Sequence, residues 1–277
     1  MGNVPSITLN NGVQIPQLGF GVWQVPPEET APAVEHALRS GYRSIDTAAA
    51  YGNEEGVGEA IKNSGLGRDE LFVTTKLWNA HHGYDETLRA FDDSMGKLGL
   101  DHLDLYLIHW ALPKRDRYVD TWKAFEKLHA DGRIRAIGVS NFHAAHLQRL
   151  FDETEIVPAV NQIELHPNLP QAELRAFHAR HNIATEAWSP LAQGGLVKDP
   201  SLAGLAEKYG KTPAQVVLRW HIQLGNIVIP KSVTPSRIEE NIDVFDFELA
   251  DDDLAAIDAL ENNGRVGPNP DTFDYVG

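Results

Sequence analysis

Short apolar runs of strand length alternate along the chain with segments in which apolar residues follow a helical period. Strands that alternate with helices pair in parallel, and eight such units in 277 residues fit a closed barrel better than an open sheet. The pattern therefore predicts an α/β fold, a single (β/α)8 TIM barrel in which residues 1–277 form one domain. We place its strands at 18–23, 42–46, 71–76, 103–109, 134–141, 159–165, 183–188 and 226–232.

The helical period is plainest where Leu88, Phe91, Met95 and Leu98 are spaced by 3, 4 and 3, which places them on one helix face. The chain after the last strand should also open a helix, and a C-terminal helix and tail follow. We expect the tail, residues 264–277, to fold over the barrel mouth. The other predicted helices lie within 30–40, 120–130, 144–151, 171–181 and 254–260, the last entered through the acidic turn 248–253.

Residues 6–16 predict an N-terminal β-hairpin ahead of the barrel. Asn11 and Gly12 lie between its two short apolar strands, and this pair tolerates the positive φ angles of a tight hairpin turn. We expect the hairpin to act as a lid or a plug.

Composition limits the classes of partner. The formal charge of −15 repels nucleic acid and anionic membranes at long range, and the absence of cysteine excludes disulfides and thiolate chemistry. No apolar run approaches the roughly 18 residues that a membrane-spanning helix requires. Gly2 and Ser6 match a myristoylation pattern, but no polybasic second signal follows them. We therefore expect a cytoplasmic protein without lipidation.

Polar residues recur where the predicted strands end, and barrels of this class keep their chemistry at the carboxyl ends of the strands. Taken singly, Asp46 suits a helix cap, Lys76 a side chain that reaches solvent, and His109 a hydrogen-bonded core imidazole. Their convergence at one end of a barrel favours a functional site. The strand-end residues are Asp46, Lys76, His109, Trp110, Ser140, Asn141, Gln162, Glu164, Trp188, Ser189, Lys231 and Ser232.

Asp46 and Tyr51, five residues apart, suggest proton transfer. A phenol with a pKa of about 10 donates poorly near neutrality, so we expect the Lys76 ammonium to lower the pKa of Tyr51 and Asp46 to keep Lys76 charged. His109 would orient the oxygen that is protonated. This set suits protonation of an oxyanion formed on a carbonyl carbon, and reduction then needs an external hydride carrier, for which a nicotinamide is the natural choice.

The histidine pairs do not predict a metal site. His81 with His82, His143 with His146, and His178 with His181 lack further ligands at zinc spacing. We interpret them as solvated helix or loop histidines, and the first strand has no His-x-His pair of the kind that zinc-dependent barrel hydrolases carry.

Three motifs carry a family resemblance: GYRSIDTAAAYGNEEGVG at 41–58, RAIGVSNF at 135–142 and IPKSVTPSRIEEN at 229–241. The chain resembles the aldo-keto reductases, in particular short bacterial members of the 2,5-diketo-D-gluconate reductase type. The resemblance implies a catalytic tetrad of Asp46, Tyr51, Lys76 and His109, with Tyr51 as the general acid.

The resemblance also implies NADPH bound across the strand ends without a dinucleotide-binding fold. Gly19 and Gly21 lack the third glycine of that fingerprint, so we interpret them as close packing in the first strand. Ser140, Asn141 and Gln162 would contact the nicotinamide carboxamide, and Trp188, a tyrosine in many relatives, would stack on the ring. The full expected cofactor set is Trp23, Ser140, Asn141, Gln162, Trp188, Ser189, Leu191, Lys231, Ser232, Val233, Arg237, Glu240 and Asn241.

The phosphate contacts distinguish NADPH from NADH. Lys231, Ser232, Arg237 and Asn241 lie around the helix start after the last strand, where amides and cations favour a phosphate. The alternative is that Arg237 and Glu240 form an ordinary exposed helix pair.

Trp23, Trp78, His109 and Trp110 are the expected substrate residues, with three indoles as an apolar wall. Small aldehydes, ketoaldehydes and α-dicarbonyl compounds are the implied substrates. Residues 111–113 replace a proline that often follows His-Trp in relatives, and Ser44 replaces a common histidine.

Two other functions stay open. One is a lyase in which Lys76 forms a Schiff base, and the other is a slow NADPH-binding regulatory subunit. No apolar surface stripe is evident, so we expect a monomer.

Overall fold

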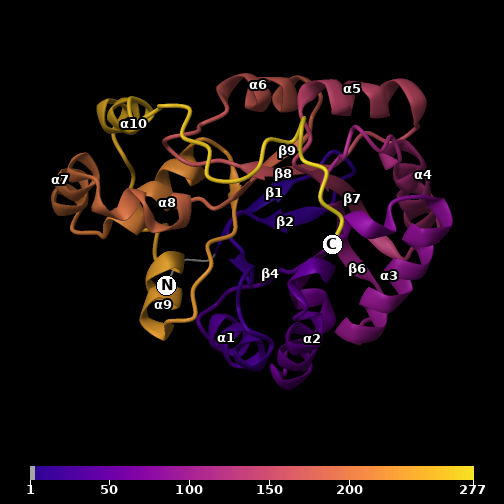
Figure 1. Cartoon of the computed structure of the whole chain (residues 1–277). Helices are drawn as coiled ribbons and strands as arrows, with labels where there is room; N and C mark the ends of the chain where they lie inside the picture. The colour runs from indigo at the N-terminus through magenta and orange to yellow at the C-terminus, as the bar shows by residue number, and fades with distance from the viewer. Residues whose placement is uncertain (1–3) are drawn as a thin grey trace.

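Eight parallel strands form a closed barrel at the centre of the molecule. The structure, a computed structural model, describes residues 4–277. Its sheet has the order β10-β9-β8-β7-β6-β5-β4-β3, and a parallel bridge between Leu18 and Val228 joins its two edges. The predicted barrel is therefore confirmed (Figure 1). The strands are β3 (Phe20–Gly21), β4 (Ser44–Asp46), β5 (Phe72–Leu77), β6 (Leu103–Ile108), β7 (Ile134–Ser140), β8 (Val160–Glu164), β9 (Ala184–Trp188) and β10 (Ile227–Val228).

The first strand is held close to both its neighbours by two glycines. A Cβ on Gly19 would lie 2.9 Å from Ser44 Oγ, and a Cβ on Gly21 would lie 2.9 Å from the Ile229 carbonyl oxygen. Their interpretation as close-packing residues is confirmed, and Ser44 is a packing residue opposite Gly19. The junction where β3 meets β10 is closely packed but has little regular strand pairing. Each of these two strands is only two residues long, shorter than the predicted run.

Within residues 4–277, ten α-helices surround the barrel (Figure 1). The predicted ones are confirmed to within a few residues at their ends. No range was predicted for α2, α7 or α8; in α2 the apolar stripe is broken by Gly56 and Gly58, which pack closely against Thr30 and Leu98. The helices are α1 (Pro27–Arg39), α2 (Glu54–Asn63), α3 (Tyr84–Leu98), α4 (Tyr118–Ala130), α5 (Ala144–Glu153), α6 (Ala172–Arg180), α7 (Pro200–Tyr209), α8 (Pro213–Gln223), α9 (Pro235–Ile242) and α10 (Asp251–Asp258).

The N-terminal hairpin plugs the amino end of the barrel. Its strands are β1 (Ser6–Thr8) and β2 (Gln14–Pro16), and Leu9 and Ile15 pack into an apolar cluster with the barrel-lining residues, Phe72 among them. The turn is a five-residue loop, with Leu9 N–H donating to the Val13 oxygen, and of its residues only Gly12 has a positive φ, at 85°. Gly12 N–H donates to the Leu9 oxygen at 2.9 Å, so the predicted tight turn around Asn11 and Gly12 is confirmed, with a positive φ at Gly12 and not at Asn11. The plug is confirmed as well.

Ile15→Ala should destabilise the fold without changing the chemistry. Ile15 is fully buried, and removing a buried aliphatic side chain costs about 2–5 kcal/mol in lost burial and cavity formation. Urea unfolding measures the loss, with Val13→Ala, partly buried in the same hairpin, as the milder control. Steady-state turnover should be unaffected because the strand ends that carry the chemistry lie at the other end of the barrel; a large drop in turnover of folded protein would contradict the plug role.

Candidate active site

A buried ammonium group lies at the centre of the site. Lys76, near the end of β5, is fully buried, and its Nζ donates to Asp46 Oδ1 at 2.6 Å, to the Thr47 carbonyl oxygen at 2.9 Å and to the Tyr51 hydroxyl at 3.3 Å. Asp46 ends the neighbouring strand β4 and is also buried. Parallel pairing of β4 with β5 therefore brings the predicted acid, cation and phenol together.

The turn that carries Tyr51 is fixed by a residue that the sequence did not single out. Tyr51 ends a short 3-10 helix, η1 (Ala49–Tyr51), which Gly52 terminates with a φ of 67°. The buried Asn53 then donates to the Val22 carbonyl oxygen at 3.0 Å and accepts from Thr47 Oγ1 at 2.8 Å. The contact with Val22 ties the turn to the loop after β3. The five-residue spacing between Asp46 and Tyr51 therefore brings the Tyr51 hydroxyl back to Lys76.

Charge pairing decides the ionisation of Lys76. Burial by itself lowers the pKa of Lys76, but the charge of Asp46, with smaller effects from Tyr51 and Glu186, outweighs it and raises that pKa above its ordinary value. The ammonium is therefore charged near neutrality, as predicted.

The pKa of Tyr51 moves in the direction opposite to the prediction. Burial is the largest effect and raises the pKa of Tyr51, while the Lys76 ammonium lowers it and offsets only part of the rise. The phenol is consequently protonated near neutrality. We had expected Lys76 to bring the pKa of Tyr51 below the ordinary value of a phenol. Instead, Lys76 only reduces the cost of forming a buried phenolate.

His109 is an uncharged imidazole beside the phenol. Burial, and secondarily the Lys76 charge, lower the pKa of His109 well below its ordinary value. Its ring packs edge-on against Tyr51 at 5.8 Å and Trp78 at 5.5 Å between centroids. Nδ1 is buried and has no hydrogen-bond partner within residues 4–277.

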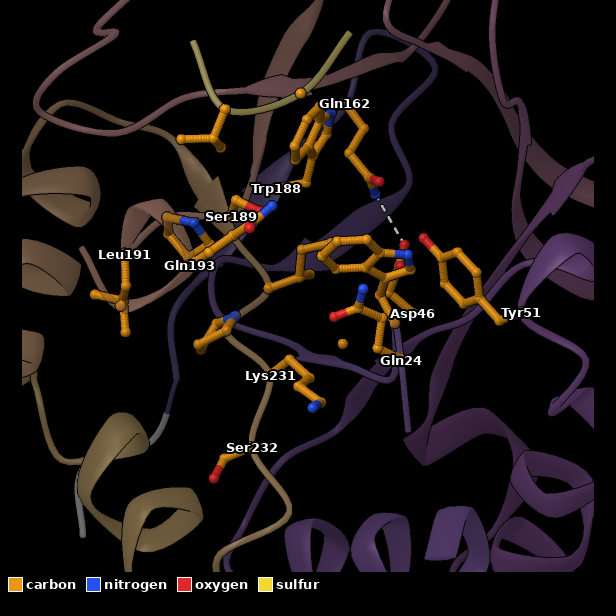
Figure 2. A pocket seen from close by; sticks show the side chains of 18 of the residues that line it. Gln24, Asp46, Tyr51, Gln162, Trp188, Ser189, Leu191, Gln193, Lys231 and Ser232 are labelled. Carbon is orange, nitrogen blue, oxygen red and sulfur yellow. Dashed lines mark hydrogen bonds between the residues drawn. The ribbon is translucent and has the colours of Figure 1, made fainter. Parts of the chain in front are cut away.

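A second buried carboxyl group, missed in the sequence, adjoins the site. Gln162 Nε2 donates to Asp46 Oδ2 at 2.8 Å, the dashed contact in Figure 2, and to Glu186 Oε2 at 3.0 Å. Burial, followed by the charge of Asp46, raises the pKa of Glu186 to about 8. The signal that would have found it is strand alternation, since Glu186 lies two residues before Trp188 and shares its side of β9.

Glu186→Gln should change how stability depends on pH. Below pH 4.5, the ordinary pKa of a glutamate, Glu186 is protonated in both the folded and the unfolded chain. Between pH 4.5 and about 8 it ionises only in the unfolded chain, so the free energy of unfolding falls as pH rises. The glutamine side chain of the Glu186→Gln variant does not ionise, so the variant does not lose stability in this way. The melting temperature of the variant relative to the original should therefore rise by several degrees from pH 5 to pH 9, at about 2–4 °C per kcal/mol. A difference that stays constant over this range would contradict a raised pKa.

A cavity of about 1220 Å³ opens over the strand ends and gathers the predicted residues. Every predicted cofactor and substrate residue lines it, as do Asp46, Tyr51 and His109, whereas Lys76 lies fully buried beneath. Residues that line it but were not predicted include Gln24, Gln193 and Pro268. In Figure 2 Lys231 and Ser232 lie apart from Tyr51 and Gln162, on the segment that leads to α9.

The end of the cavity at α9 suits a phosphate. Within residues 4–277, Lys231 and Arg237 have no carboxylate within 4.0 Å. Glu240 Oε1 accepts instead from Thr212 Oγ1 at 2.6 Å, so the alternative of an Arg237–Glu240 helix pair was wrong. Two cations without acidic partners beside a helix N-terminus fit the phosphate of NADPH.

The C-terminal tail folds over the mouth, as expected. Glu164, buried at the end of β8, accepts from Val266 N at 2.6 Å and Gly267 N at 2.9 Å. Trp78 Nε1 donates to the Val276 oxygen at 3.0 Å, and Figure 1 shows the tail running from α10 across the barrel. Gly267 is needed for close approach, because a Cβ there would lie 2.4 Å from Trp188 Cη2.

Three of the histidines predicted to be solvated are buried: His82, His146 and His178. His178 is a core residue that hydrogen-bonds Asn161 at 2.9 Å and Thr185 at 2.8 Å. Within the described part of the chain no cluster of three or more His, Asp or Glu is arranged to hold a metal ion.

No helix in residues 4–277 is both long and apolar enough to cross a membrane. The myristoylation pattern begins at Gly2, which lies outside the described residues. After Trp110 the chain continues through Ala111 and Leu112, both buried, and Leu112 has a φ of 47°.

Comparison with known proteins agrees with this geometry. Residues 17–262 match the Aldo/keto reductase family. The chain belongs to this family. It is 61% identical over 273 residues to an aldo-keto reductase of Mycobacterium sp. (strain KMS), with 99% of each chain covered. It is 55% identical over 275 residues to methylglyoxal reductase DkgA of Escherichia coli (strain K12), again with 99% of each covered.

Among solved structures, a Gox0644 mutant in complex with NADPH is similar with a TM-score of 0.96 and 50% identity, covering 99% of this chain and 100% of that one. The interpretation of the chain as an oxidoreductase of the aldo/keto reductase family is thus confirmed.

Proposed function

We propose that this aldo/keto reductase uses NADPH to reduce small aldehydes, ketoaldehydes and α-dicarbonyl compounds to alcohols, as a single-domain monomer in the cytoplasm. One observation carries the proposal. A phenol at a cavity wall is hydrogen-bonded to an ammonium that Asp46 holds charged, and the same cavity continues to the cations Lys231 and Arg237.

The chain's residues supply a proton and a place for the carbonyl oxygen. When bound, NADPH supplies a hydride to the carbonyl carbon. Tyr51 gives its phenolic proton to the oxygen as negative charge develops there, and the Lys76 ammonium at 3.3 Å stabilises the phenolate that is left. His109, neutral at the cavity wall, orients the carbonyl oxygen by a hydrogen bond.

The cofactor would extend along the cavity from Tyr51 to α9. Ser140, Asn141 and Gln162 lie where they would hold the carboxamide, and the Trp188 indole would stack on the ring. Ser189 and Leu191 also line the cavity. At the far end Lys231, Ser232, Val233, Arg237, Glu240 and Asn241 would hold the adenosine portion and its phosphate.

The substrate end is walled by indoles. Trp23, Trp78 and Trp110 line the cavity, and the Trp78 ring packs against His109 at 5.5 Å between centroids. This apolar surface with two polar points suits a small carbonyl compound. The similarity to methylglyoxal reductase DkgA supports α-dicarbonyl compounds as substrates.

The Schiff-base alternative is disfavoured by the charge of Lys76. A lysine nucleophile must lose its proton, whereas Asp46 raises the pKa of Lys76 and the side chain is fully buried. A slow regulatory subunit is disfavoured because Tyr51 and His109 line the open cavity and Lys76, directly beneath, is hydrogen-bonded to Tyr51.

Tyr51→Phe should abolish reduction and leave NADPH binding nearly unchanged. The variant removes only the hydroxyl that gives the proton, so turnover of methylglyoxal should fall by at least a thousandfold, in the upper range of general acid effects. NADPH consumption measures turnover, and quenching of tryptophan fluorescence measures binding. Retained turnover would refute the acid role of Tyr51.

Lys231→Ala and Arg237→Ala should weaken NADPH far more than NADH. Each removes a charge-assisted contact to the extra phosphate, so about tenfold or more in NADPH dissociation constant is expected, with little change for NADH. Isothermal titration with both cofactors provides the comparison. Equal weakening of both would show that these cations do not recognise the 2′-phosphate.

A further inference from the structure

The Gln162 amide is held between two buried carboxyl groups. Its Nε2 donates one hydrogen to Asp46 at 2.8 Å and the other to Glu186 at 3.0 Å. Gln162 and Glu186 are each 1% exposed and Asp46 is 2% exposed, so water does not compete for these contacts. A primary amide has two N–H donors, and both are therefore used.

This pairing fixes which end of the amide faces the cavity. Turning the amide over would direct its oxygen at the ionised Asp46, which repels it, and would leave the Asp46 and Glu186 oxygens without their N–H donors. Gln162 lines the cavity, and no donor within residues 4–277 reaches its Oε1. The amide therefore presents an acceptor, and no donor, to whatever lies at this end of the cavity.

The neighbouring polar groups are already engaged. Ser140 Oγ donates to the Gln162 carbonyl oxygen at 2.8 Å and accepts from Asn141 Nδ2 at 3.1 Å. Asn141 Nδ2 also donates to the His109 carbonyl oxygen, and Asn141 Oδ1 accepts from Trp188 Nε1 at 2.8 Å. Among Ser140, Asn141 and Gln162, Oε1 of Gln162 is the acceptor left without a donor in the described chain.

We propose that Glu186 is a positioning residue that makes this end of the cavity select a ligand with an N–H donor, the carboxamide amine of the nicotinamide. The inference rests on the proposed use of NADPH and extends it to a residue that does not line the cavity. Glu186 occupies the second Gln162 hydrogen, so the amide cannot rotate to offer a donor. The Gln162 amide thus connects Asp46, and through it Lys76 and Tyr51, to the preference for a nicotinamide carboxamide.

The test compares NADPH with its 3-acetylpyridine analogue, in which a methyl group replaces the carboxamide amine. Dissociation constants are measured by titration calorimetry for the original protein, Glu186→Gln and Glu186→Leu. The original protein should favour NADPH by about tenfold, the loss of one buried hydrogen bond. Glu186→Gln retains an acceptor for the Gln162 hydrogen and should keep that ratio, whereas Glu186→Leu should reduce it about fivefold.

Two further variants keep the outcome decisive. Glu186→Asp withdraws the carboxylate from Gln162 and should also lower the ratio, which covers a failure of Glu186→Leu to fold. Glu54→Leu is the matched control, since Glu54 is equally buried but accepts from Thr75 Oγ1 at 2.6 Å and does not line the cavity; its ratio should be unchanged.

The possible failures can be told apart. If Glu186→Leu and Glu186→Asp keep the original ratio, or if Glu186→Gln loses as much as Glu186→Leu, the positioning role is wrong while NADPH use stands. If the original protein does not bind NADPH at all, both the proposed function and this inference are wrong.

Discussion

The ion pair between Lys76 and Asp46 is the interaction on which the site depends. An ammonium without solvent is costly, and Lys76 is stable in its buried place because Asp46 at 2.6 Å and the Thr47 carbonyl oxygen satisfy it. Its remaining hydrogen reaches Tyr51 at 3.3 Å. Removing Asp46 would leave an unpaired buried charge, so one contact determines both local stability and the readiness of the phenol to give up its proton.

The barrel supplies the constraint that brings these groups together. Parallel strands end at one rim, so Asp46 on β4, Lys76 on β5 and Gln162 on β8 meet although up to 116 residues separate them. The two ends of the barrel are closed differently. The N-terminal hairpin fills the amino end with apolar side chains, while the tail covers the other end through polar contacts to Glu164 and leaves the cavity below it.

The sequence predicts the barrel, the hairpin plug and the convergence of Asp46, Tyr51, Lys76 and His109, because strand periodicity and strand-end polarity are local signals. Contacts that form only in the folded barrel cannot be predicted from these local signals. Glu186 meets Gln162 only across paired strands, and Asn53 meets Val22 only once the turn at Gly52 is formed. The direction of the pKa shift of Tyr51 was wrong because the extent of burial outweighs the neighbouring cation, and His178 was misplaced because its helix turns that side chain toward β9.

The central claim is that Asp46 keeps the buried Lys76 charged next to the phenol. Its most direct test is the ¹⁵N resonance of Lys76 Nζ followed against pH, in the original protein and in Asp46→Asn. The account predicts that the original ammonium is still largely protonated at pH 10.5, the ordinary lysine pKa, and that the variant loses its proton at lower pH. Loss of the Lys76 proton below pH 10.5 in the original protein would contradict it.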